Sequence, residues 1–188
     1  MHYNKNMTKW TLEPGHTAAE FKVRHMMVTW VRGSIKDVHG TLNFDHENPT
    51  EASVEIEMDA RKIWSGEEDR DTHLKGEEFL DVENHPTITF KSTSVEQSGC
   101  NTYKVKGDLT IRGITKEVIL ETEHVGQWDT PFREDGEDKG PKVRAGFHAT
   151  TKINRQDFGV NWQSKLDKGG VVAGDEVYIT IDAEAIRD

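Results

Sequence analysis

Acidic, basic and imidazole side chains that could transfer protons gather in one short stretch, which holds Asp69, Arg70, Asp71 and His73. A carboxylate and a histidine this close could act as an acid-base pair if the fold turned both toward one substrate. Helix capping and a network of surface salt bridges would explain the same residues without catalysis. Because no nucleophile elbow, phosphate-binding loop or dinucleotide-binding motif accompanies them, we predict no catalytic residues.

The chain contains nine histidines, which raises the question of a metal centre. Their spacing does not match a His-Glu-x-x-His motif, and there are no Cys/His pairs at zinc spacing. We therefore predict no metal ligands. His25 and His124 fall on the inward phase of expected strands, where each imidazole needs a hydrogen-bond partner. A backbone group, a carboxylate or a ligand headgroup could supply that partner.

Long runs of alternating apolar and polar residues must position these groups. Ala52, Val54, Ile56 and Met58 alternate with polar neighbours, and residues 177–183 repeat the pattern. A period of two predicts strands with one wet face and one dry face. Many such strands in 188 residues must bury their dry faces against each other, as an antiparallel barrel does. We predict an all-β fold, an extended antiparallel β-barrel of about eight strands with one or two short helices.

Three segments carry more specific predictions about the strands. Gly33–Phe44 is expected to form a single strand, and Val105–Ile111 with Ile114–Val125 a hairpin around Gly113. Met26–Arg32 is apolar on all sides, so we expect a short helix or a corner that plugs one end of the barrel.

A helix and a long loop are expected elsewhere. Ser65 and Glu68 match a capping box, which predicts a helix from there to about Lys75 with Gly76 as its stop, lying over a barrel opening. Residues 126–142 are rich in Gly, Asp, Glu and Pro and are predicted to be the longest loop. Such a loop is either a solvated connection or a ligand lid.

The charge balance limits the classes of partner. The formal net charge is −10, and 24 Lys and Arg residues are scattered among 34 acidic ones. A nucleic-acid groove needs a basic stripe, so we predict no nucleic-acid partner. The same balance argues against a surface that docks on anionic lipid headgroups. No apolar run is long enough for a membrane span, so we predict no transmembrane segment.

The ends and the single cysteine add little chemistry. Cys100 lies in a polar turn, and one cysteine allows no internal disulfide. The N-terminus lacks the apolar core of a secretory signal, so we expect a cytoplasmic protein, with a mature secreted form as the alternative. We predict one domain over residues 9–188. Residues 1–8 are an N-terminal extension or a cloning remnant, with Met7 as a natural start.

Several blocks of sequence, in order from about Lys9 to Ile186, resemble the YceI-like family. The blocks are Trp10-Thr-Leu-Glu-Pro-Gly-His16-Thr17, Phe21-Lys-Val-Arg-His25, Arg70-Asp71-Thr-His73-Leu74-Lys, Phe79-Leu-Asp-Val, His85-Pro86-Thr-Ile-Thr-Phe90-Lys-Ser92, Gly107-Asp-Leu-Thr-Ile-Arg-Gly113-Ile-Thr-Lys116 and Ile153-Asn-Arg155-Gln-Asp157-Phe158-Gly159. Glu13 stands where the family commonly has Asp, and Thr17 where it commonly has Ser.

The resemblance implies a lipocalin-like barrel that encloses a long polyisoprenoid or related lipid and catalyses no known reaction. It also marks six polar residues as special, which we take as candidates for contacting a lipid headgroup near a mouth. These candidates are His16, His25, Asp71, His73, Arg112 and Arg155. We expect no cofactor other than a bound polyisoprenoid-type lipid.

Small and medium side chains on the inward phase predict a lumen that the protein does not fill by itself. Because empty apolar volume is costly to stability, a long hydrocarbon would stabilise the barrel by occupying it. The aromatic side chains could instead close this space. We expect the lumen to be lined by Phe21, Val23, Val54, Ile56, Met58, Phe90, Val105, Leu109, Val118, Leu120, Phe147, Trp162, Val177 and Ile179.

We predict a protein that binds and carries or sequesters one long-chain isoprenoid or quinone-like lipid. The first alternative is an enzyme that uses the Asp71 and His73 region, with Arg155, on an isoprenoid or quinone-like substrate. The second is a packed structural barrel that acts through protein partners. A homodimer is also expected, because exposed apolar side chains such as Ile119 need cover.

Overall fold

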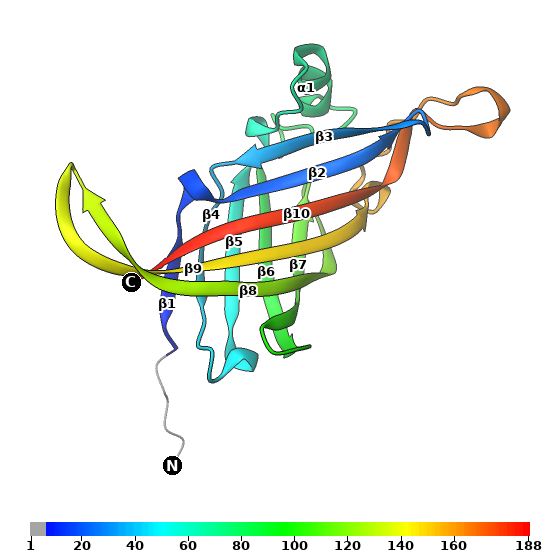
Figure 1. Ribbon diagram of the computed structural model, residues 1–188. Helices are drawn as coiled ribbons and strands as arrows, with labels where there is room; N and C mark the ends of the chain where they lie inside the picture. Colours follow the sequence, from blue (N-terminus) through cyan, green and yellow to red (C-terminus); the bar gives the residue numbers. More distant parts are fainter. Residues whose placement is uncertain (1–6) are drawn as a thin grey trace.

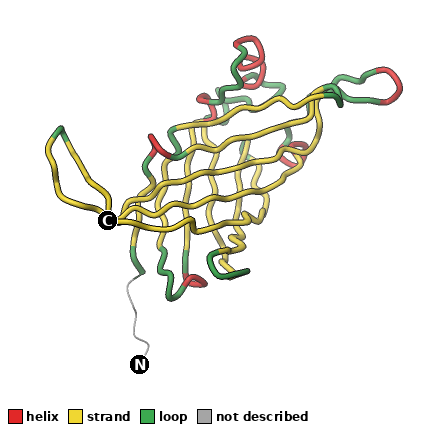
Figure 2. Tube along the Cα trace, viewed as in Figure 1, coloured by secondary structure: helices red, strands yellow, loops and turns green. Residues whose placement is uncertain are grey.

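The computed structural model describes residues 7–188, and its strands form one antiparallel sheet that closes on itself (Figures 1 and 2). The strands are β1 (Lys9–Leu12), β2 (Ala18–His25), β3 (Thr29–Lys36), β4 (His39–Asn43), β5 (Ser53–Asp59), β6 (Thr87–Gln97), β7 (Thr102–Ile111), β8 (Ile114–Glu134), β9 (Glu137–Asn154) and β10 (Ala173–Arg187). Residues 1–6, most of the expected extension, lie outside the described residues.

Pairing of β1 with β10 closes a ring of eight strands in the order β1-β4-β5-β6-β7-β8-β9-β10. The β2–β3 hairpin pairs with another part of β10 and extends the wall beside β1 and β4. The predicted all-β barrel of about eight strands is therefore confirmed. Closure pairs both edges of the eight-strand ring, and β3 remains at the edge of the added hairpin.

Short helical segments connect the strands. The one α-helix in the described part of the chain is α1 (Glu68–Lys75). The 3₁₀ turns are η1 (Pro14–His16), η2 (Pro49–Glu51), η3 (Ala60–Lys62), η4 (Arg155–Phe158) and η5 (Asp167–Gly169). Figure 1 shows α1 at one end of the barrel, and the β4–β5 and β6–β7 turns at the opposite end.

The inward phase of the strands forms the core, as the period of two predicts. Leu120 and His124 of β8 are buried, whereas Ile119, which precedes Leu120 on the outward phase, is 47% exposed. Trp10 is buried beside the closure and donates its indole N–H to the carbonyl oxygen of Phe44 at 3.1 Å. The buried tryptophan and the β1–β10 pairing thus fasten the same seam.

The prediction of a helix or plug at residues 26–32 is wrong. Residues 26–28 form the turn of the β2–β3 hairpin, and β3 begins at Thr29. Val28 is 79% exposed, so these apolar side chains close no barrel end. The expected single strand over residues 33–44 is also wrong, because a turn at Asp37, with φ of 62°, separates β3 from β4.

The predicted long loop at residues 126–142 is a two-stranded ribbon. The β8 and β9 strands stay paired from Gln127 with Ala145 to Glu134 with Glu137, with a bulge near Pro131. The ribbon extends away from the barrel, at the left of Figure 1. Both of its faces meet solvent over most of its length, so its sequence lacks the alternation of apolar and polar residues from which strands were predicted.

The helix exists where it was expected, but its capping differs. Glu67 is the N-cap and accepts hydrogen bonds from the amides of Asp69 and Arg70. Ser65 instead donates its hydroxyl to Asp71 Oδ1. Gly76 follows the last helical residue, as predicted.

Candidate functional site

The barrel interior contains a cavity of about 320 Å³, called the main cavity here. This volume is at the lower end of the range for small-molecule sites. Its lining side chains are predominantly apolar and come from β2, β3, β5, β6, β7, β8, β9 and β10. Inward-facing residues from around the wall therefore converge on one apolar space.

A second cavity of about 90 Å³, called the narrow cavity here, lies toward the β4–β5 and β6–β7 turns. Ile56, Leu120 and Ile181 line both cavities, so they form a neck between them. Together the two spaces run along the barrel from the α1 end toward the opposite end.

All the side chains predicted for the lumen line one of these two cavities. Those in the main cavity are Phe21, Val23, Ile56, Met58, Phe90, Leu109, Val118, Leu120, Trp162, Val177 and Ile179. Val54, Val105 and Phe147 line the narrow cavity, together with Ile56 and Leu120 of the neck. The placement follows from the strand alternation; contact with a ligand remains a prediction.

The main cavity reaches solvent near α1 and the tip of the β2–β3 hairpin, because several lining residues there are partly exposed. This mouth comprises Arg24 and His25 of β2, His73 of α1, and Phe79, Trp162 and Val172 of the connecting segments. The His73 ring packs edge-on against Phe79 and Trp162, with centroids 4.7 and 5.2 Å away. An aromatic cluster therefore borders the opening.

Three of the six headgroup candidates, His25, His73 and Arg155, line the main cavity. Arg155 is 6% exposed, and all five of its N–H groups already have acceptors within the protein. The acceptors are the carbonyl oxygens of Val160, Trp162, Ala173 and Gly174 and the carboxylate of Asp175. Burial lowers the pKa of Arg155, and Asp175 opposes that shift. The arginine thus fastens the mouth segment to β10 and has no donor left for a ligand.

The two headgroup candidates on α1, Asp71 and His73, also have partners within the protein. His73 Nε2 lies 2.8 Å from Glu78 Oε2. Asp71 is buried and accepts hydrogen bonds from the amide and hydroxyl of Ser65, at 2.8 and 2.5 Å. Asp71 does not line the cavity, so the acid-imidazole pair of the enzyme alternative does not face one substrate. Instead these contacts hold α1 over the opening.

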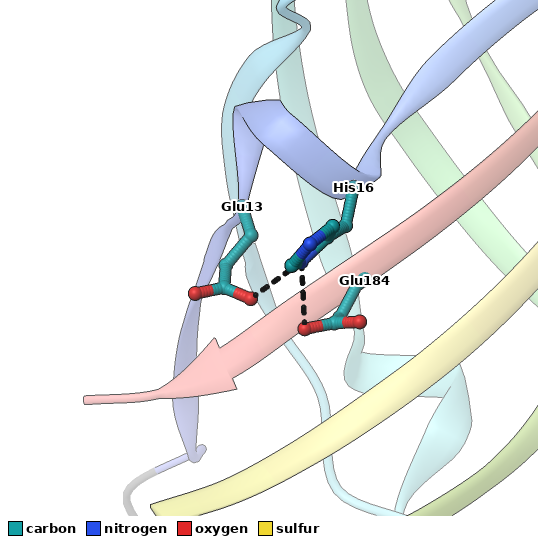
Figure 3. Close-up of side chains that lie close together, drawn as sticks. All are labelled: Glu13, His16 and Glu184. Carbon is teal, nitrogen blue, oxygen red and sulfur yellow. Dashed lines mark hydrogen bonds and ion pairs between the residues drawn. The ribbon is translucent and has the colours of Figure 1, made fainter. Parts of the chain in front are cut away.

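Arg112 and His16 lie away from both cavities. Arg112 donates to the carbonyl oxygens of Gly159 and Glu77, and so joins the β7–β8 turn to two other segments. His16 is exposed and lies between two carboxylates, 3.2 Å from Glu13 Oε2 and 3.3 Å from Glu184 Oε1 (Figure 3). The sequence blocks that carry these residues therefore maintain turns and the closure seam.

The Glu13, His16 and Glu184 cluster has the ligand atoms of a metal site within 4.8 Å of one another. Arg144 already binds both carboxylates, with Nε 3.1 Å from Glu13 Oε2 and 2.8 Å from Glu184 Oε1. Partial burial acts to raise the pKa of Glu13, but hydrogen bonds with Arg144, Glu184 and His16 outweigh it and lower the pKa to about 2. We therefore assign this cluster to closure of the barrel.

Two buried polar atoms in the described part of the chain have no hydrogen-bond partner: Tyr103 Oη and His124 Nε2. Sequence reasoning placed His124 inside but overlooked Tyr103, whose inward phase on β7 could have revealed it. Arg70 was treated only as part of a surface cluster, yet it lines the main cavity. Its position depends on how α1 docks, which the sequence pattern does not specify.

The fold and the cavities define a closed antiparallel β-barrel with a lipocalin-like architecture and an apolar interior. A family model described as the YceI-like domain matches residues 10–185, and the chain belongs to this family. Protein YceI of Escherichia coli O157:H7 is 35% identical over 175 residues, which span 93% of this chain and 84% of the relative.

Solved structures support the same fold. BcnA of Burkholderia cenocepacia matches with a TM-score of 0.77 and 20% identity, over 92% of this chain and 98% of that chain. A polyisoprenoid binding domain from Saccharophagus degradans matches with a TM-score of 0.67 and 8% identity, over 97% of this chain and 100% of that chain. Among the described residues, no helix combines the length and apolar character needed to cross a membrane.

Proposed function

We propose that this protein binds one long-chain polyisoprenoid-type lipid inside the barrel and carries or sequesters it. The observation that carries the proposal is the main cavity, an apolar space of about 320 Å³ that opens at a mouth beside α1. Apolar surface gains about 25 cal/mol for each Å² removed from water, so a hydrocarbon tail is favoured in such a space.

The shape of the cavities supports an elongated ligand. The main and narrow cavities share the neck of Ile56, Leu120 and Ile181, so a tail can lie along the barrel axis. Filling this volume restores the dispersion contacts that an empty apolar cavity lacks. The Saccharophagus degradans neighbour is described as a polyisoprenoid binding domain, which supports the same ligand class.

The alternatives fit the geometry less well. An enzyme using Asp71, His73 and Arg155 would need these groups directed at one substrate, but Asp71 binds Ser65 and Arg155 binds main-chain carbonyl groups. A packed barrel would have no internal cavity. We therefore favour a binding protein over an enzyme, with a quinone-like lipid retained as an alternative ligand.

Native mass spectrometry of the purified protein, followed by solvent extraction, tests the proposal. We expect one bound species per chain with a prenyl-type mass, or uptake of one polyprenol by protein purified without lipid. Protein that keeps its bare mass after incubation with polyprenols and prenylquinones would contradict the proposal. The same samples should be assayed for chemical change of the bound lipid, since turnover would favour the enzyme.

Location and assembly are further proposals. We propose a cytoplasmic protein, which cell fractionation would test. We also propose a homodimer that covers the outward side chain of Ile119, 47% exposed on β8. Sedimentation equilibrium should then give twice the chain mass, and Ile119→Glu should give monomers.

A further inference from the structure

Tyr103 and His124 each bury a polar atom without a partner. Tyr103 is 3% exposed and His124 is 7% exposed, and neither Oη nor Nε2 has a hydrogen-bond partner in the described part of the chain. A buried polar group without a partner costs about 1–3 kcal/mol, so native proteins rarely keep one. The two atoms therefore indicate a missing partner from outside the chain.

Both side chains belong to the same end of the barrel. Tyr103 of β7 pairs with Thr122 of β8, and His124 lies two residues farther along β8 on the same face. The ring of Phe44 contacts both, with centroids 6.0 Å from Tyr103 and 5.1 Å from His124. Phe44, Tyr103 and Thr122 line the narrow cavity, and His124 lies beside it, with its ring centroid 5.2 Å from that of Phe147, which also lines the cavity.

The narrow cavity suits an uncharged group. Its lining contains no Lys, Arg, Asp or Glu. Burial lowers the pKa of His124, as does the nearby His46, while a main-chain hydrogen bond at Gly126 opposes the shift. A neutral imidazole with a free Nε2 accepts a hydrogen bond, and a tyrosine hydroxyl can donate one. A hydroxyl group satisfies both, whereas a phosphate would find no cation.

Two of the polar side chains near the mouth already form hydrogen bonds within the protein. All five N–H groups of Arg155 are used, and His73 is paired with Glu78. The expectation that polar groups near a mouth hold the head stays a prediction for His25, which lines the main cavity. The buried polar atoms that lack a partner lie beyond the neck, in the strand ends that line the narrow cavity, whereas His25 at the mouth is partly exposed and can bond to water.

We propose that the narrow cavity binds the polar end of the ligand, and that this end is an uncharged alcohol or phenol hydroxyl held between Tyr103 Oη and His124 Nε2. The tail then passes the neck of Ile56, Leu120 and Ile181 and extends toward the mouth. The inference rests on the proposed function and names the chemical class of the headgroup.

Binding of two matched probes tests this inference: geranylgeraniol, and the hydrocarbon that lacks only its hydroxyl. We expect the wild-type protein to bind the alcohol about tenfold more tightly, since one buried hydrogen bond is worth about 1–1.5 kcal/mol. Tyr103→Phe removes the orphaned hydroxyl and should reduce that preference severalfold. The same change should raise the unfolding midpoint of the lipid-free protein, because it removes an unpaired buried group.

Tyr178→Phe is the matched control, because Tyr178 bonds Glu176 on the outer surface. It should leave both affinities unchanged. If Tyr103→Phe also leaves the alcohol preference unchanged, the headgroup assignment is wrong, and an ordered water is the missing partner. If the wild-type protein binds neither probe, the proposed function itself fails.

A separate observation concerns the tip of the β2–β3 hairpin. Met26, Met27 and Val28 are 44%, 59% and 79% exposed. Met26 and Met27 have φ values of 49° and 61°, a region that suits Asn-Gly and strains bulky side chains. The turn thus keeps three apolar side chains in water on a strained backbone.

Five cations on β2, on β3 and in the segment that precedes β10 have no acidic partner in the described part of the chain. Lys22, Arg24, Arg32, Lys165 and Lys168 form no ion pair with the described residues. The net charge of −10 argued against docking on anionic headgroups, but that charge is spread unevenly over the chain. A local basic region with apolar side chains is typical of membrane-surface contact.

The tip also adjoins the mouth. Met26 donates its amide N–H to the carbonyl oxygen of Val172 at 2.7 Å, and Val172 lines the main cavity beside Arg24 and His25. Figure 1 shows the tip of β2 and β3 beside the segment that precedes β10. We infer that this tip docks on an anionic bilayer and brings the mouth to the membrane surface.

Co-sedimentation with phosphatidylcholine vesicles, with and without phosphatidylglycerol, tests this second inference. We expect binding only to the anionic vesicles, falling as salt is raised. The double variant Met26→Asn with Met27→Gly should lower vesicle binding about tenfold while raising the unfolding midpoint, because the turn strain is relieved. The control pair Val125→Ser with Trp128→Ser removes exposed apolar groups elsewhere and should retain binding. Equal loss in both pairs, or loss in neither, would overturn the docking assignment.

Discussion

The ring of Phe90 on β6 lies against Gly107 on β7, where an added Cβ would be 2.5 Å from Phe90 Cζ and 2.6 Å from the carbonyl oxygen of Lys91. Phe21 makes the same kind of contact with Gly33 between β2 and β3. An aromatic ring therefore occupies the space that each glycine leaves on the inner wall. The small inward residue at 107 does not contribute empty volume, and the cavity depends on the rest of the wall.

Gly107→Ala should destabilise the protein by about 1–3 kcal/mol, because the new methyl group forces Phe90 or the β6 main chain to move. Gly146→Ala is the control, since a Cβ there would meet Val125 at an ordinary 3.6 Å. Urea unfolding of the lipid-free proteins measures both. Equal midpoints for the two variants would show that the ring yields without cost.

Arg155→Lys should destabilise the protein by about 3 kcal/mol, because an ammonium group cannot reach the five acceptors that the guanidinium holds. Arg61→Lys, at an exposed pair with Asp59, should cost far less, because solvent screens that pair. Thermal unfolding compares them. We also expect faster lipid exchange in Arg155→Lys, since the segment that borders the mouth loses its hydrogen bonds to β10. An unchanged exchange rate would show that Arg155 does not control the mouth.

We predict that the protein loses stability in acid, because the pKa of the Glu13 carboxyl group is lowered in the folded state. Its pKa is lowered from 4.5 to about 2 in the folded protein, so its contribution is present above pH 4.5 and is lost as the pH falls through about 2. Glu184 opposes this, because hydrogen bonding to Glu13 and burial raise its pKa. Glu13→Gln should therefore flatten the stability curve between pH 4.5 and 2 by about 1–2 kcal/mol.

The contribution of His16 to stability depends on pH in the opposite direction to that of Glu13. Hydrogen bonding to Glu13 and the charge of Glu184 raise its pKa above 6.5, so its contribution is present below pH 6.5 and is lost as the pH rises above that value. Unfolding of His16→Gln, followed from pH 5 to 9, should show a smaller decline than the wild-type protein. A steeper decline in the variant would contradict the contacts in Figure 3.

The sequence predicted the barrel because a period of two reports directly which face of a strand is buried. The sequence-based prediction was wrong where apolar residues are exposed or where polar residues form paired strands. Residues 26–28 are apolar but exposed, so hydrophobicity alone misplaced them. Residues 127–142 pair through main-chain groups while both faces meet solvent over most of their length, so their polar composition indicated a loop.

The cavity walls followed from the same alternation, but the polar candidates did not. His16 and Arg112 belong to sequence blocks of the family, yet their hydrogen bonds hold turns and the closure seam. Whether a polar residue faces a cavity depends on the docking of α1 and the connecting segments. Tyr103 and His124 become informative only when their missing partners are visible in three dimensions.

The central claim is that the lipid lies inside the barrel, and substitution at the neck tests it most directly. Leu120→Trp places a bulky ring between the two cavities, whereas Ile119→Trp places the same ring outside on the adjacent residue of β8. Stoichiometric polyprenol binding should be measured by native mass spectrometry for both folded variants. We predict that Leu120→Trp loses the bound lipid and Ile119→Trp keeps it; lipid retained at wild-type affinity in Leu120→Trp would contradict the account.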